Sequence, residues 1–174
     1  MKTLDEQMSF YAAYHQDPRN KATHFVGVPV IVFSLMIPLG WLRVEAGDTA
    51  VSAAFVVSAV LVAYYLALDA ILGCAMGVLF AAMLWLAEPL ARAPLGTGAT
   101  WFVALFVGGW VLQLWGHVFE GRKPALVDNL FQIFVAPIFL CAEAFFALGY
   151  RPALRDAVQR RALELRAAAA KPAA

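Results

Sequence analysis

Three histidines are the residues of this chain whose positions suggest chemistry. The 174-residue sequence contains only His15, His24 and His117. The first two precede the first long apolar stretch, and His117 lies near the end of a later one, three residues before Glu120. Ionisable side chains at the edge of a membrane-length helix are costly to desolvate, so they mark candidate functional sites. A cluster of neutral imidazoles suits Zn, Cu, Fe or Ni.

Glu120 belongs to a polar stripe. Gln113, His117 and Glu120 are spaced four and three residues apart, so a helix presents them on one face. Any one of them alone is ordinarily explained by a hydrogen bond to a neighbouring helix. Three converging histidines instead favour a metal ion with open coordination positions. Glu120 is then either a fourth ligand or an acceptor that orients an imidazole.

Two polar residues before His24 allow two interpretations. Asp17 and Asn20 are candidates for supporting the site. They are equally typical of a turn, with Asp17-Pro18 ending one helix and Asn20 or Thr23 capping the next.

Four further residues are candidates for the pocket. Tyr11 and Tyr14 could line it, although interfacial aromatic residues are common in membrane proteins. Arg122 and Lys123 directly follow the polar stripe. They could anchor the helix end to lipid head groups, or bind the carboxylate of a fatty acid.

The composition indicates that lipid is the solvent for much of this chain. Hydrophobic residues make up 63% of it and charged residues only 14%, with a mean hydropathy of +0.73. A small globule could not bury so much apolar surface. The net charge of +1 gives no reason to expect a nucleic acid partner.

The apolar pattern predicts an all-α, polytopic membrane helical bundle. We expect one membrane-embedded catalytic domain over residues 1–174, with an N-terminal interfacial helix and turn over 1–23 and a basic amphipathic C-terminal helix over 151–174. The expected segments are an amphipathic helix at 3–16, apolar runs at 25–41, 49–68, 70–86, 100–119 and 126–150, and a charged connector at 43–48.

Charge placement predicts the topology. Basic residues precede the first run and follow the fourth and fifth, and the positive-inside rule places all three groups in the cytoplasm. Four crossings satisfy this rule, with a re-entrant or interfacial fifth segment broken near Pro137. The start of run one and the end of run four then share one membrane face, which allows the three histidines to meet there. The C-terminal helix is expected on the membrane surface.

Two stretches carry a family resemblance. Residues 14–29 contain His15, Asn20 and His24 followed by a Gly-x-Pro motif, and residues 113–126 contain Gly-His, then Glu120, then Pro-Ala-Leu. Together they resemble the fungal and bacterial 2-hydroxy fatty acid dioxygenase family of the Mpo type. The order of the motifs and the several apolar runs agree over nearly the whole chain.

The resemblance implies an iron(II)-dependent membrane enzyme that shortens a 2-hydroxy fatty acid by one carbon using O2. His15, His24 and His117 match the family's iron-associated histidines. We select as candidate catalytic residues Glu120, Asn20 and Arg122, and as candidate substrate-binding residues Tyr11, Tyr14, Gln113 and Lys123. Fungal relatives are set in the endoplasmic reticulum, and a bacterial inner membrane with both termini cytoplasmic is expected here. A homo-oligomer is left open.

Three rival functions remain open from the residues. A zinc-dependent membrane hydrolase of an amide such as ceramide would use the same histidines with Glu120 as general base. A small transporter or proton relay would use the intramembrane acids Asp69, Glu120, Asp128 and Glu143. A structural membrane subunit would need neither metal nor relay.

Overall fold

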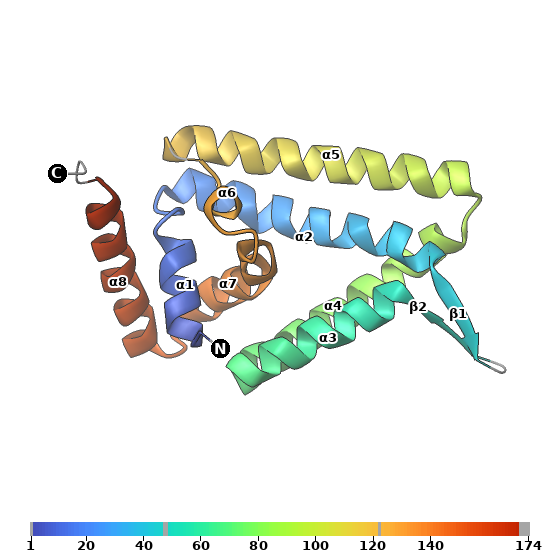
Figure 1. The fold of residues 1–174 in the computed structure, drawn as a ribbon, viewed down its shortest axis with the longest axis horizontal. Helices are drawn as coiled ribbons and strands as arrows, with labels where there is room; N and C mark the ends of the chain where they lie inside the picture. The colour runs from blue at the N-terminus through green and yellow to red at the C-terminus, as the bar shows by residue number, and fades with distance from the viewer. Residues whose placement is uncertain (1, 47–48, 122, 171–174) are drawn as a thin grey trace. The chain divides into compact units, whose positions relative to one another are not determined.

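The computed structural model describes residues 2–46, 49–121 and 123–170, and it is helical apart from one small hairpin (Figure 1). Its elements in chain order are α1 (Leu4–Ala12), α2 (Pro18–Trp41), β1 (Arg43–Ala46), β2 (Thr49–Ser52), α3 (Ala53–Leu68), α4 (Ala70–Arg92), α5 (Leu95–Glu120), α6 (Ala125–Asp128), α7 (Gln132–Ala147) and α8 (Pro152–Ala170). The predicted all-α class is confirmed.

Contacts divide the chain into two compact units. The first comprises residues 1–24 and 114–174, and the second comprises residues 25–113. The first unit therefore joins the two ends of the sequence and contains all three histidines. The prediction of a single catalytic domain stays a prediction.

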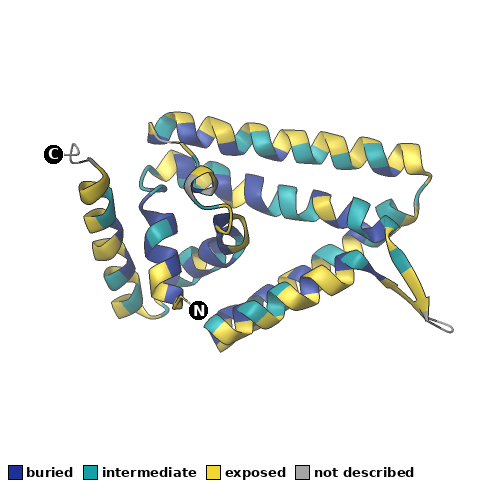
Figure 2. Ribbon diagram, in the orientation of Figure 1, coloured by how far each residue is buried: buried dark blue, intermediate teal, exposed yellow. Residues whose placement is uncertain are grey.

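In the first unit, α1 packs against both α8 and α7 (Figure 1). Helix α8 buries Val158 and Ala162, while much of its remaining surface is exposed (Figure 2). Its apolar stripe thus contributes to a protein core beside α1, whereas the sequence led us to expect this stripe on the membrane surface. The physical reason is that α1 offers an apolar partner to the same stripe, with Leu4 and Met8 buried.

The turn between α1 and α2 differs from the predicted one. Helix α1 ends at Ala12 rather than near residue 16, and two tight i to i+3 backbone bonds follow it. Pro18 begins α2 instead of only separating two helices. The Asp17 carboxylate accepts the Arg19 N–H at 2.8 Å, so Asp17 is the cap and proline occupies the first helical position.

Asn20 and Thr23 therefore do not cap α2, and the capping prediction for them was wrong. Both lie inside the helix. Capping by Asp17 leaves the Asn20 side chain available for other partners.

The fifth apolar run is interrupted earlier than predicted. The short helix α6 ends at Asp128, and α7 starts at Gln132. Helix α7 then continues through Pro137, so the break near that proline was wrongly placed. Several α7 residues are buried, among them Ile138 and Phe139, and α7 packs on α1.

The second unit contains the hairpin that the sequence did not predict. Strands β1 and β2 pair antiparallel, with Arg43 opposite Ser52. The strand residues Thr49 to Ser52 were expected to begin the second apolar helix, which is therefore shortened to 16 residues. The Arg43 guanidinium binds both carboxylate oxygens of Glu88 at 2.9 Å each, which ties the hairpin to α4.

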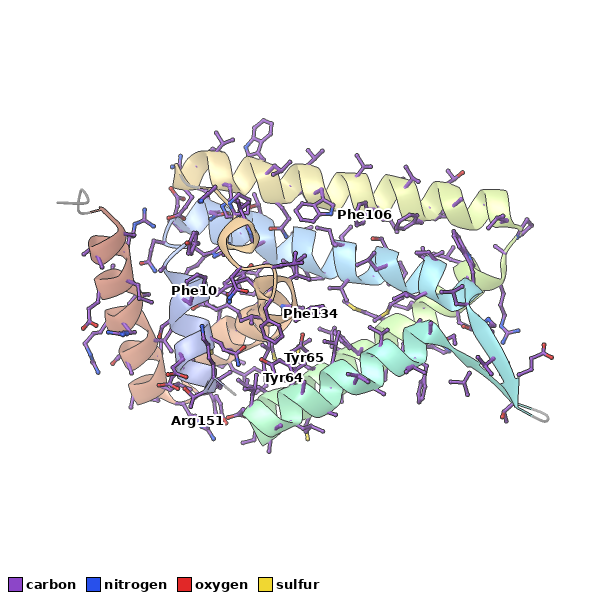
Figure 3. All side chains as sticks on the ribbon, in the orientation of Figure 1. Phe10, Tyr64, Tyr65, Phe106, Phe134 and Arg151 are labelled. Atoms are coloured by element: carbon purple, nitrogen blue, oxygen red, sulfur yellow. The ribbon has the colours of Figure 1, made fainter. Side chains whose placement is uncertain are left out.

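Helices α3 and α4 form a close hairpin. The Asp69 carboxylate between them caps α4 by accepting the N–H groups of Ile71 and Leu72 at 3.0 and 2.9 Å. A methyl group on Gly73 would lie 2.6 Å from the backbone of Leu66, so only glycine permits this approach. Tyr65 of α3, labelled in Figure 3, is fully buried and its ring lies 6.2 Å from that of Phe80.

Three helices among the described residues are long and apolar enough to cross a membrane, namely α2, α4 and α5. Helices α3 and α7 are apolar but shorter. Membrane association is thus supported by length and composition, and the predicted number of four spans stays a prediction.

Candidate metal centre

The three histidines of the chain converge in the first unit. Their ring centroids are 4.5 Å apart for His15 and His24, 5.1 Å for His15 and His117, and 5.0 Å for His24 and His117. One ligand nitrogen from each lies within 4.8 Å of the others, and all three side chains are buried. His15 comes from the turn after α1, His24 from the second turn of α2, and His117 from the last turn of α5.

Backbone carbonyls fix the tautomers of two of these imidazoles. The Nδ1 of His15 lies 2.7 Å from the Tyr11 carbonyl oxygen, and the Nδ1 of His24 lies 2.9 Å from that of Asn20. A carbonyl can only accept, so both Nδ1 atoms carry the proton. Both Nε2 atoms are then left with a bare lone pair.

The Nε2 atoms of His15 and His24, which carry these lone pairs, are only 3.1 Å apart. Two bare acceptors at hydrogen-bond distance repel each other unless a cation or a proton lies between them. Two nitrogens bound to one ion at about 2.1 Å and at a right angle would lie about 3 Å apart. The donor set therefore fits a transition metal ion that prefers imidazole.

Burial keeps His15 in the form that a metal requires. Desolvation, and secondly the charge of His24, lowers the pKa of His15 well below its ordinary value. The imidazole is therefore neutral near pH 7, as a ligand nitrogen must be.

An aromatic wall supports His15. The Tyr11 ring stacks on the His15 ring with centroids 4.0 Å apart and planes 6° apart. Phe139 of α7 in turn lies 4.6 Å from the Tyr11 ring. Tyr11 is buried, so its place in the structure is that of a packing neighbour which also supplies the carbonyl for His15.

Glu120 is bound to the turn that carries His15. Its Oε2 accepts the N–H groups of Gln16 and Asp17 at 2.9 and 2.8 Å, and Nδ2 of Asn20 at 3.2 Å. Its Oε1 accepts from Arg166 of α8. Asp17 contributes its backbone here, while its carboxylate forms an ion pair with Arg19.

Gly116 permits α2 and α5 to approach each other at this site. A methyl group there would collide with the side chains of Thr23 and Asn20. The glycine before His117 in the sequence motif is thus a place of close helix contact. This contact brings His24 and His117 together.

The other predicted residues occupy varied surroundings. Tyr14 is half-buried, with its ring 5.3 Å from that of Phe10 (labelled in Figure 3), and its carbonyl accepts from Asn20 at 3.4 Å. Lys123 is exposed just after α5. Arg122 lies outside the described residues. Gln113 belongs to the second unit, where it is buried against Gly27.

Two features of the first unit were not predicted from the sequence. Arg166 was one of several arginines in a basic helix, and nothing in its spacing pointed to Glu120. The Lys21 ammonium forms an ion pair at 2.8 Å with Glu143 of α7, and both side chains are half-buried. Because Lys21 and Glu143 are 122 residues apart in the sequence, no local pattern predicts this pair.

Comparison with known families now bears on the site. The profile of a family described as 2-hydroxy-palmitic acid dioxygenase Mpo1-like matches residues 1–148. The chain belongs to this family. This Mpo1-like chain is also 35% identical over 158 residues to the 2-hydroxy-palmitic acid dioxygenase MPO1 of Saccharomyces cerevisiae, covering 90% of this chain and 87% of the yeast protein. No solved structure matches the chain.

Proposed function

We propose that this chain is an iron(II)-dependent dioxygenase that shortens 2-hydroxy fatty acids by one carbon using O2. Family membership and the similarity to the yeast dioxygenase support an enzyme that acts on 2-hydroxy fatty acids. The single observation that supports a metal is the buried cluster of His15, His24 and His117 with converging ligand atoms. Iron is our choice for the ion because the reaction consumes O2.

In this proposal the imidazoles of His15, His24 and His117 would hold the ion, and the substrate and O2 would bind beside them. Bound iron(II) would supply the redox chemistry by which O2 cleaves the bond between C1 and C2. The protein's own contribution is to orient the hydroxy acid and to exclude water from the centre. Burial of all three histidines supports the second of these tasks.

The remaining predicted residues have proposed roles around the substrate. Arg122 or Lys123 would offset the charge of the fatty acid carboxylate. Tyr14 would line the path of the substrate, and Tyr11 would hold His15 in place through ring stacking. Gln113 stays a predicted substrate-binding residue. The acyl chain would run along apolar helix faces and into the membrane.

We further propose four crossings, with both termini in the cytoplasm of a bacterial inner membrane. His24 near the start of α2 and His117 near the end of α5 lie in one cluster. If both helices span, the chain between them must leave and return to the same side, so α3 and α4 both cross or neither does. Helix α4 is long enough, whereas the 16 residues of α3 extend only about 24 Å. A thinned bilayer or the adjoining strand residues would have to complete that crossing.

The experiment uses the purified chain loaded anaerobically with one equivalent of iron(II). With 2-hydroxypalmitate and O2, we expect a product one carbon shorter, and with zinc(II) in place of iron(II) we expect none. A chain that holds iron and consumes no 2-hydroxypalmitate would contradict the substrate. Palmitate is the matched control, since it lacks the 2-hydroxyl group.

The rival functions are less well supported by the same contacts. A hydrolase needs a general base, but the Glu120 carboxylate is already bound by four donors. A relay needs unengaged carboxylates, but Asp69 caps α4 and Glu143 pairs with Lys21. The side chain of Asp128 lies outside the described residues.

A further inference from the structure

Glu120 lies beside the three histidines and its carboxylate accepts four hydrogen bonds, but it is not one of the proposed metal ligands. Glu120 has a side chain with 0% exposure. It accepts bonds from two backbone N–H groups, one amide and one guanidinium. A carboxylate so surrounded has little capacity left to abstract a proton, but it can fix everything that donates to it.

Three of these donors lie on the segment between two histidines. Gln16 directly follows His15, Asp17 directly precedes α2, and Asn20 lies in the first turn of α2, one turn before His24. Glu120 itself is three residues after His117 on α5. The carboxylate therefore links the His15 to His24 segment to the helix that supplies the third histidine.

The fourth donor comes from the far end of the chain. Arg166 of α8 reaches Glu120 with a side chain that is 32% exposed, and its Nη1 also lies 3.4 Å from the Ala13 carbonyl oxygen. A buried carboxylate without a cation is strongly unfavourable, so Arg166 lets Glu120 stay charged where it is. Helix α8 begins at Pro152, after the residues 1–148 that the family profile matches.

We propose that Glu120 and Arg166 form a positioning pair which holds the His15 to His24 segment against the end of α5, and that α8 is thereby part of the metal centre. Neither residue touches the reacting atoms in this inference. It rests on the proposed function only for the presence of a metal ion, and it assigns Glu120 a positioning role in place of the catalytic one expected from the sequence.

The test measures metal affinity in the full-length protein in detergent. Co2+ serves as the probe, because its d–d absorption reports both binding and ligand arrangement. Arg166→Gln is expected to weaken Co2+ binding by about tenfold, as loss of a residue that orients metal ligands does, and to alter the absorption bands. Arg161→Gln is the matched control on the same helix, because the ion-pair partner of Arg161 is the exposed side chain of Glu164. The Arg161→Gln variant should bind Co2+ as the wild type does.

Two further variants separate positioning from simple loss of structure. Arg166→Lys keeps the cation and should recover part of the affinity. Glu120→Gln should weaken Co2+ binding at least as much as Arg166→Gln. The double variant should bind no more weakly than Glu120→Gln alone, since both changes remove the same interaction.

The outcomes distinguish this inference from the proposed function. Wild-type protein that binds neither Co2+ nor Fe2+ would overturn both. Wild-type binding with an unchanged affinity and spectrum in Arg166→Gln would overturn the positioning pair alone. The same would follow if Arg166→Gln merely lowered the melting temperature of the metal-free protein while its Co2+ spectrum and affinity stayed those of Arg161→Gln.

Discussion

The two compact units of this chain are stabilised in different ways. In the first unit, buried polar groups are bonded between distant parts of the sequence, as in the bond from Asn20 to Glu120 across 100 residues. In the second unit, described polar bonds include a local helix cap, that of α4 by Asp69, and an ion pair across 45 residues between Arg43 and Glu88. Close helix contact there depends on small residues, with Gly73 against the backbone of Leu66.

This difference indicates a division of tasks. Apolar residues of the second unit such as Val60, Val78 and Trp85 are exposed in the protein, which suits helices whose solvent is lipid. In the first unit, buried polar groups hold the three imidazoles in place. Changes to the contacts that hold the three histidines in the first unit should therefore alter metal binding, and changes in the second unit should alter stability without altering metal affinity.

The largest effect is expected from removal of one histidine. His117→Ala takes away a proposed metal ligand, so turnover of 2-hydroxypalmitate should fall at least a hundredfold. Val118→Ala is the control, because Val118 is the next residue on α5 and is 77% exposed. Turnover in His117→Ala equal to that of Val118→Ala would remove His117 from the site.

A glycine substitution in each unit tests the division directly. Gly116→Ala forces Thr23 and Asn20 away from α5 and should weaken metal binding by roughly ten- to a hundredfold. Gly73→Ala also disturbs a close contact, since its methyl group would lie 2.6 Å from the Leu66 backbone, but it should only lower thermal stability. Isothermal titration measures metal affinity, and thermal unfolding measures stability. Gly108→Ala is the reference variant and should change neither quantity through a clash, since a methyl group at Gly108 meets no atom within 4 Å. Equal losses of metal affinity in Gly116→Ala and Gly73→Ala would refute the division.

A moderate effect is expected from the ion pair between α2 and α7. Lys21→Met removes the cation from the Glu143 carboxylate, whose side chain is 22% exposed in the intact pair. We expect a loss of about 1–2 kcal/mol in stability, between the values for exposed and buried pairs. Arg161→Gln is the control, because it removes an exposed ion pair, that of Arg161 with Glu164. It should change the free energy of unfolding by less than about 0.5 kcal/mol. If the unfolding curves of Lys21→Met and Arg161→Gln coincide, the ion pair between Lys21 and Glu143 does not stabilise the protein measurably.

The smallest effect is expected from a helix cap in the second unit. Asp69→Ala removes the acceptor for the first N–H groups of α4 and should cost about 1 kcal/mol. Metal affinity should stay that of the wild type, which Co2+ titration checks. Asp69→Asn retains a capping oxygen and should recover most of the stability. A drop in metal affinity for Asp69→Ala would show that the two units are coupled energetically.

The site could be predicted further from the sequence than the fold around it. Convergence of His24 and His117 followed from counting crossings, and the stripe of His117 and Glu120 followed from helical spacing. The sequence does not predict the β1–β2 hairpin, because its strands have only four residues each and their residues are also typical of a charged connector and of the start of a helix.

Residues that act through distant partners were beyond prediction. Arg166 resembles its neighbours in an arginine-rich helix, and only the folded chain brings it to Glu120. Asn20 is a residue type that commonly caps a helix, but Asp17 caps α2 and Asn20 lies inside it. For Arg166 the deciding factor is a tertiary contact, which local spacing does not encode. For Asn20 it is a local one, because the cap is the hydrogen bond from the Arg19 N–H to Asp17.

X-ray absorption at the iron edge of the anaerobic, iron(II)-loaded protein tests the central claim most directly. Scattering from imidazole rings counts the histidines bound to the ion. The account predicts one iron per chain bound by three imidazoles in the wild type, and loss of that signature in His15→Ala, His24→Ala and His117→Ala. An iron centre without imidazole scattering, or one unchanged in these variants, would contradict it.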